Sequence, residues 1–201
     1  MASQSYYNSI PILLHELTHD LQQQQCLYTP QENLCFELSP KLPLRSVAAF
    51  KSFPFKDENT IKGLSFIQNM YMTATDQPPL ILFDELNAYI VTNKTMTHIL
   101  EKEGPSVLFD GEKRPGVFLP MFLLYTVRYL SHVKNNEPEL YKINFESHEG
   151  NRAALKILWS NGENTYTKWK SLLKKTGHEE KPFESAYWHD YLQEKKNLHL
   201  F

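Results

Sequence analysis

Apolar side chains recur every three or four positions along most of the chain, which is the spacing of one buried face of an α-helix. This pattern predicts helices over residues 11–25, 57–75, 80–103, 120–133, 149–160, 165–175 and 183–196. Pro11 suits the first turn of the first helix, because a first-turn N–H has no partner inside a helix. Gly104-Pro105 ends the long helix over 80–103, and Asn161-Gly162 separates two of the later helices.

Two stretches depart from the helical pattern. Residues 26–56 contain four prolines, so we expect a long irregular excursion there. Residues 107–109 and 117–119 are short apolar runs on either side of Asp110-Gly111, which is typical of a β-hairpin with a long loop. The predicted fold class is therefore mainly α with a small β element (α+β). We expect a single domain, 1–201, with the Pro-rich excursion at 26–56 and a helical C-terminal part from about residue 137.

The composition is that of an ordinary soluble globular protein, because 41% of the 201 residues are hydrophobic and 22% are charged. A net charge of -2 gives no sign of a nucleic-acid partner or of binding to an anionic membrane. No apolar run is long enough to span a bilayer, and the chain begins without a signal-peptide pattern. We therefore expect a cytoplasmic location, unless export needs no such signal or a leader has been removed. The oligomeric state is not predicted.

Residues 15–19 read His-Glu-Leu-Thr-His, which has the form H-E-x-x-H. On a helix His15 and His19 lie about 40° apart and one turn along, so both imidazoles can reach one metal ion. Glu16 lies beside them, where it can accept a proton from a water on the metal. The motif follows an apolar run, residues 12–14, that can be buried. The alternative interpretation is a surface helix with two histidines one turn apart.

The same five residues resemble the active-site motif of the zincin superfamily of metallopeptidases, and His-Glu-Leu-Thr-His is the form seen in thermolysin-like peptidases. The resemblance implies a Zn²⁺ cofactor, a peptide or protein substrate and a third protein ligand. The metzincin branch requires further ligand positions that are occupied here by Gln22 and Gln25. The gluzincin branch takes a glutamate from a later helix. The thermolysin-like spacing indicates Glu37, but Pro40 and Pro43 make a helix improbable there.

Glu85 fits the third ligand better than Glu37 does. With Ala88 it resembles the E-x-x-A pattern of several gluzincin branches, in which the small residue lets the two helices approach closely. On a helix Glu85 shares an otherwise apolar face with Ala88, Tyr89, Thr92 and Met96. A carboxylate on such a face needs a partner, because burying an unpaired charge is costly. Zinc would be that partner, and a lysine or arginine at the edge of the core is the alternative.

Two neighbours of Glu85 are candidates for supporting roles. Asp84 is rotated by about 100° from Glu85, so it is expected to cap the helix or to orient a metal-binding histidine through the other ring nitrogen. Tyr89 lies one turn after Glu85 and is the first candidate for stabilising the oxyanion of a tetrahedral intermediate. The alternatives for that role are Tyr129, His132 and His148.

The predicted function is that of a gluzincin-like zinc metallopeptidase, in which Glu16 assists the attack of zinc-bound water on a peptide bond. Two alternatives stay open: a catalytically inactive zincin-like module for metal binding or protein interaction, and a helical interaction protein whose motif is accidental. Zincins bind their substrate along a sheet that precedes the motif helix. Here about ten residues precede that helix, so the sheet comes from the 107–119 hairpin, from preceding sequence, or is absent.

Overall fold

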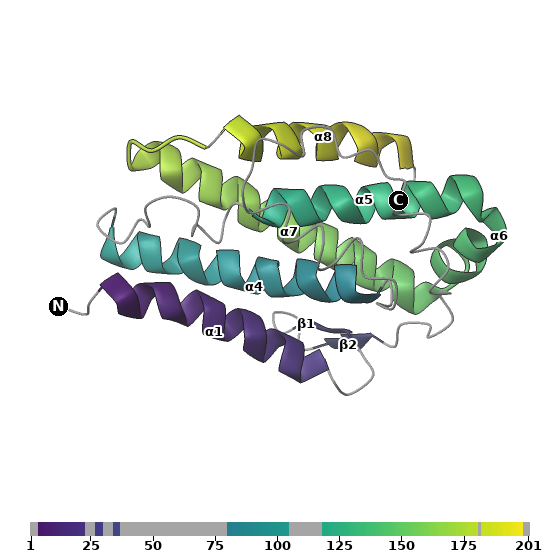
Figure 1. Cartoon of the computed structure of the whole chain (residues 1–201), viewed down its shortest axis with the longest axis horizontal. Coiled ribbons are helices and arrows are strands. Elements are labelled where there is room, and N and C mark those ends of the chain that lie inside the picture. The colour runs from purple at the N-terminus through teal and green to yellow at the C-terminus, as the bar shows by residue number, and fades with distance from the viewer. Residues whose placement is uncertain are drawn as a thin grey trace.

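The long helices of the protein lie side by side (Figure 1). The computed structural model describes residues 4–22, 27–29, 34–36, 80–104, 118–180 and 182–198, and these are mostly helical. Helix α4 packs against α1 on one side and against α7 on another, and α5 packs against both α4 and α8. The elements, in chain order, are α1 (Gln4–Gln22), β1 (Leu27–Thr29), β2 (Leu34–Phe36), α4 (Leu80–Glu103), α5 (Phe118–Asn136), α6 (Pro138–Tyr141), the π-helical turn η5 (Lys142–Glu146), α7 (Glu149–Lys175) and α8 (Pro182–Leu198).

Helix α5 is the centre of the hydrophobic core, because nearly all of its first ten residues are apolar. Leu119, Phe122 and Leu123 are completely buried there. Trp159 and Trp169 of α7 are buried in the same cluster, together with side chains of α4 and α8. Burial of large apolar side chains is the dominant favourable term in folding, so this core fixes α4 and gives the α1–α4 pair a rigid support.

The helix predicted over residues 80–103 is confirmed as α4. Gly104 follows it with a φ of 76°, a left-handed conformation that suits glycine and ends the helix. The first predicted helix begins earlier than expected, since α1 starts at Gln4 and Pro11 lies inside it rather than in its first turn. Pro11 is buried. Packing of α1 on α4 therefore outweighs the loss of the one backbone hydrogen bond that a proline cannot donate.

The two helices predicted over 149–160 and 165–175 are one continuous helix, α7. The Asn161-Gly162 pair between them was expected to break the helix, and this expectation is wrong. A Cβ atom at Gly162 would lie 2.9 Å from Leu123 Cδ2 on α5. Glycine therefore allows a close approach of α7 to α5, and core packing on both sides of it outweighs the roughly 1 kcal/mol that glycine costs in a helix. The last predicted helix, 183–196, is confirmed as α8.

The described strands form one antiparallel hairpin, in which Leu27 pairs with Phe36 and Thr29 with Leu34. This hairpin lies in the Pro-rich excursion, where no regular structure was expected. The hairpin predicted over 107–119 is wrong in its last two residues, since Phe118 and Leu119 form the first turn of α5. These apolar residues join the core helix that follows them instead of pairing as a strand. The rest of that prediction, and the helix predicted over 57–75, lie outside the described residues.

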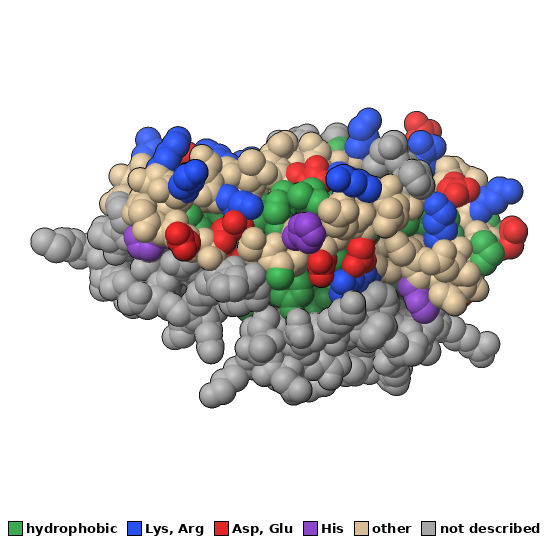
Figure 2. Space-filling view, turned by 90° about the horizontal axis from the view of Figure 1, so that it is seen from above, with side chains coloured by type: hydrophobic (Ala, Val, Ile, Leu, Met, Phe, Trp, Pro, Cys, Tyr) green, Lys and Arg blue, Asp and Glu red, His purple; other side chains and the backbone are tan. Residues whose placement is uncertain are grey.

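Acidic and basic side chains are interspersed around a hydrophobic area on the face seen in Figure 2, and neither sign dominates it. Among the described residues, no helix combines the length and the apolar character needed to cross a membrane. The predicted site residues His15, His19 and Glu85 lie in the α1–α4 pair, away from the centre of the core.

Candidate metal centre

The predicted metal ligands meet at the contact between α1 and α4. His15 and His19 project from α1, one turn apart, and Glu85 projects from α4. Glu85 is almost completely buried, as are Ala88 and Thr92 on the same face of α4. The methyl group of Ala88 leaves room for α1, as expected for a small residue one turn from the carboxylate. One ligand atom from each of the three residues lies within 4.8 Å of the others.

The distances between these atoms fit a single metal ion. His15 Nε2 is 3.1 Å from His19 Nε2. The Glu85 carboxylate has Oε2 3.4 Å from His15 Nε2 and Oε1 3.3 Å from His19 Nε2. Two atoms that bind one zinc ion tetrahedrally, at bond lengths near 2.0–2.1 Å, are about 3.4 Å apart. The two nitrogens contact different oxygens of the carboxylate, and with one ligand atom from each residue all separations stay within 4.8 Å, which is close to the spacing of a tetrahedral ligand set.

The opposite nitrogens of the two imidazoles determine which atoms can bind a metal. His19 Nδ1 lies 2.9 Å from Asp84 Oδ2, and since the carboxylate accepts, Nδ1 donates its hydrogen. His15 Nδ1 lies 3.5 Å from Thr92 Oγ1, whose own hydrogen is donated to Ala88 O at 2.8 Å. In the neutral tautomers with Nδ1–H, both Nε2 atoms carry lone pairs directed at the shared point. A hydrogen bond that fixes the tautomer in this way is usual for metal-binding histidines.

Asp84 lies in the second turn of α4, so it does not cap that helix. Of its two expected roles, the contact with His19 is the one that the geometry fits. Thr92 was recognised only as part of the buried face, and its contact with His15 was not predicted. The signal was present in the spacing, because Thr92 follows Glu85 by two helical turns and so lies on the same face.

The charges of the cluster are strongly coupled. The hydrogen bond to Asp84 and the contact with Glu85 raise the pKa of His19 to about 10, and burial opposes only part of this effect. Burial alone would raise the pKa of the Glu85 carboxyl, but its contacts with His15 and His19 outweigh burial and hold that pKa at about 2. Glu85 Oε2 is buried and has no hydrogen-bond partner among the described residues. A carboxylate oxygen in this position is available to a cation.

Glu16 and Tyr89 flank the cluster. Glu16 follows His15 directly and is exposed on α1. The Tyr89 ring packs edge-on against the His15 ring, with centroids 4.5 Å apart, and stacks on Phe122 at 4.7 Å. Burial raises the pKa of Tyr89 above its usual range, and the charges of Glu85 and Glu16 add to this effect. The Tyr89 hydroxyl therefore keeps its proton at neutral pH and can donate a hydrogen bond.

The other candidate residues have separate places. Tyr129 is completely buried in the core. His148 is the N-cap of α7, and its Nδ1 accepts a hydrogen bond from Asn151 N at 3.1 Å. His132 contacts Asn136 on the outside of α5. None of the three belongs to the metal-binding group formed by the described residues. The alternative ligand Glu37 lies outside those residues.

One surface of α1 differs from expectation. The apolar run before the motif could have been buried, but Ile12 and Leu13 are 62% and 59% exposed. Leu17 and Leu21 continue an exposed apolar row from Leu13, at 44% and 51%. The reason is that α1 packs on α4 through one face only, which carries Pro11, His15 and Thr18. The leucines lie on the opposite face.

No family model matches the sequence, and searches of the curated proteins and of the solved structures found no match. The functional assignment therefore depends on the residues and on the geometry of the α1–α4 contact.

Proposed function

We propose that the protein is a gluzincin-like zinc metallopeptidase in which His15, His19 and Glu85 bind the metal. The observation that carries this proposal is the convergence of the Nε2 atoms of His15 and His19 with the buried Glu85 carboxylate, at contact distances of 3.1–3.4 Å. Two histidines and one glutamate are a common ligand set of catalytic zinc, which leaves the fourth position for water or substrate. Helix α1 would then be the active-site helix, and α4 would be the second, ligand-bearing helix.

The residues around the ligands have properties that suit peptide hydrolysis. Bound zinc supplies a Lewis acid that lowers the pKa of a coordinated water to about 7. Glu16, exposed beside His15, accepts the proton of the attacking water and passes it to the leaving amine. The protonated Tyr89 hydroxyl donates a hydrogen bond to the oxyanion that develops on the scissile carbonyl. Asp84 keeps the His19 ring in the orientation in which Nε2 can bind the metal.

A protonated His19 would also satisfy the cluster without a metal. In that state the imidazolium donates to Asp84 and lies 3.3 Å from Glu85 Oε1, which agrees with its raised pKa. The two states differ at the shared point between the rings. Without a metal, Glu85 Oε2 depends on His15 Nε2, 3.4 Å away, which is long for a hydrogen bond. Zinc bound by the carboxylate and the two Nε2 atoms would replace these long contacts, which supports the metal-bound state.

The exposed leucines of α1 favour a second candidate function. Contiguous exposed apolar side chains are typical of surfaces that bind another protein, and Leu13, Leu17 and Leu21 form such a row on the outer face of α1. The zinc cluster would then stabilise a module for protein interaction and would not hydrolyse peptides. This alternative shares the metal site with the first proposal and differs from it in the roles of Glu16 and Tyr89, which would not be catalytic.

Metal content and turnover test both candidates. After purification without added metal, we expect elemental mass spectrometry to find about one zinc ion per chain. Glu16→Gln should keep the zinc and lower turnover of a peptide library by about 10²- to 10⁴-fold, because it removes the general base. Glu139→Gln, an exposed residue of α6, is the matched control and should behave as the wild type. Equal turnover in wild type and Glu16→Gln would refute the peptidase proposal and leave the interaction module. Absence of zinc after reconstitution would refute both.

A further inference from the structure

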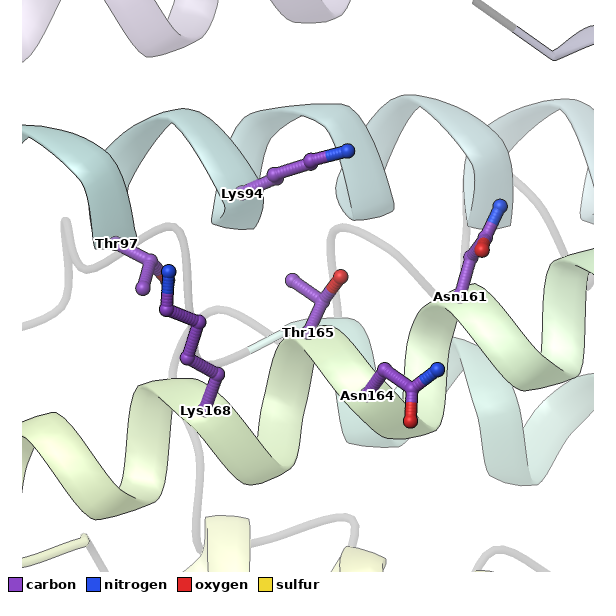
Figure 3. Close-up of a pocket in the computed structure, with 6 residues that line it drawn as sticks. All are labelled: Lys94, Thr97, Asn161, Asn164, Thr165 and Lys168. Carbon is purple, nitrogen blue, oxygen red and sulfur yellow. The ribbon is translucent and has the colours of Figure 1, made fainter. Parts of the chain in front are cut away.

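A second site lies between α4 and α7. A cavity of about 270 Å³ opens there. Figure 3 shows that Lys168 extends from α7 toward Thr97 on α4, and that Asn161 and Thr165 direct their polar ends toward α4. The cavity is lined by Lys94, Thr97, Asn161, Asn164, Thr165 and Lys168. Each of these described side chains is polar, and none of them is acidic.

The cavity is separate from the candidate metal centre. Lys94 follows Glu85 by nine residues, so it is rotated by about 180° around α4. Glu85 faces α1, whereas Thr97 faces α7 and Lys94 extends along α4 at the border of the cavity (Figure 3). The two sites therefore lie on opposite faces of one helix, and neither contributes a residue to the other.

The positive charge of the cavity is only partly neutralised. Lys168 Nζ lies 3.0 Å from Glu101 Oε2, but the two side chains are 59% and 35% exposed, and pairs that are open to solvent contribute little. Lys94 forms no ion pair with any residue in the described part of the chain. Two ammonium groups thus border one cavity with a single carboxylate at its edge. An anion that enters the cavity would lower the repulsion between them.

The Thr165 hydroxyl gives an independent indication of a ligand. Thr165 is only 8% exposed, and it lines the cavity. Its Oγ1 forms no hydrogen bond with another described residue, unlike Thr97, whose Oγ1 donates to Asn93 O at 2.7 Å. The Thr165 oxygen is not among the fully buried unpartnered atoms, so the hydroxyl is open to the cavity that it lines. Thr165 therefore offers one donor to whatever occupies the cavity, next to the amide group of Asn164.

We propose that this cavity binds a phosphate group, either as inorganic phosphate or as a small phosphate monoester. A phosphate group presents at least three acceptor oxygens, enough to contact both Lys94 and Lys168 as well as a neutral donor, whereas a carboxylate presents only two. Its oxygens can also accept from the Thr165 hydroxyl and the Asn164 amide. This proposal is independent of the metallopeptidase proposal, because the two sites use different residues and bind different species, a phosphate group here and a metal ion there.

The test is a titration of the full chain labelled with ¹⁵N, followed by NMR at pH 7.5 and constant ionic strength. Sodium phosphate should produce saturable shifts of the Thr165 and Lys168 backbone amides and of the Asn164 side-chain amide. A second titration with adenosine monophosphate distinguishes the two forms of the ligand. Tighter binding than inorganic phosphate indicates a monoester, and weaker binding indicates free phosphate.

The variants Lys94→Met and Lys168→Met should each weaken phosphate binding by about tenfold, since each removes one charged donor. Both lysines are exposed, so these variants should fold. Lys156→Met, an exposed residue elsewhere on α7, is the matched control and should bind as the wild type. Thr165→Val keeps the shape of the side chain and should also weaken binding.

Three results would overturn the proposal. The first is a shift that grows linearly with phosphate and does not saturate. The second is an equal response to sodium acetate at the same ionic strength. The third is unchanged phosphate binding in both lysine variants.

Discussion

Asp84→Asn tests whether the hydrogen bond to His19 prepares the cluster for metal. The substitution keeps the size of the side chain and an oxygen that can accept from His19 Nδ1, but it removes the negative charge. The contact is 2.9 Å long, and both side chains are 22% exposed, so solvent screens the charge only in part. Replacing a carboxylate that supports a metal-binding histidine typically costs 10- to 100-fold in metal affinity. We expect a loss in this range, which is about 1.4–2.8 kcal/mol.

The assay is a competition for zinc between the metal-free protein and a chromogenic chelator at pH 7.5. Asp190→Asn on α8 is the matched control, because it removes the same charge from an aspartate that pairs with Arg128 at 3.6 Å. A second measurement separates orientation from general damage. The pKa of His19 in the metal-free protein, followed by NMR, should fall from about 10, since Asp84 is the largest cause of its elevation. Wild-type zinc affinity together with a lowered pKa of His19 would show that the hydrogen bond does not serve the metal.

Three further predictions concern stability. In the metal-free protein the pKa of His19 is about 10, above its ordinary value of 6.5, so its stabilising contribution is complete below pH 6.5 and is lost as the pH rises to about 10. The midpoint of urea unfolding should therefore fall between pH 6.5 and about 10, and His19→Asn should flatten this dependence on pH. The same dependence on pH in the variant would exclude His19 as its cause. His148→Ala removes the side-chain cap of α7 and should lower the free energy of unfolding in urea by about 1 kcal/mol. An unchanged free energy of unfolding would mean that water replaces the cap. Arg128→Met removes contacts of 2.7–3.0 Å with Glu194 that join α5 to α8, and it should lower the free energy of unfolding by about 1–2 kcal/mol. Arg152→Met, at an exposed position, is the control. Equal melting temperatures of the two variants would contradict this prediction.

Helix α4 could be predicted from the sequence because several local signals agree. Its apolar positions keep a helical period over residues 80–103, and Gly104-Pro105 follows directly. The same periodicity singled out Glu85, since a carboxylate on a buried face stands out against apolar neighbours. The meeting of Glu85 with His15 and His19 is a contact between residues about 70 positions apart, and the expectation for it came from a known ligand pattern.

The sequence-based predictions of helix boundaries were wrong where tertiary packing outweighs the local helix preference of a residue. Pro11 and Gly162 are both unfavourable inside a helix, yet each lies in the interior of one. Pro11 is buried in α1, and Gly162 allows α7 to approach Leu123. Such compensation comes from a neighbouring helix that is distant in sequence, so no window of local sequence contains it. The exposure of Leu13 has the same origin, because the sequence cannot tell how many faces of α1 are covered.

The adjacent carboxylates Asp84 and Glu85 show how a local rule can be right and still incomplete. Their separation of about 100° on the helix means that both cannot point at one ion, and the structure agrees with this rule. An imidazole ring, however, has nitrogens on two sides. Glu85 lies near Nε2 of His19, and Asp84 lies near its Nδ1. Two consecutive acidic residues can therefore hold one histidine from both sides, which two residues on the same face of α4 could not do. The Asp84-Glu85 pair therefore accounts for both nitrogens of His19, whether Nε2 binds a metal or carries a proton.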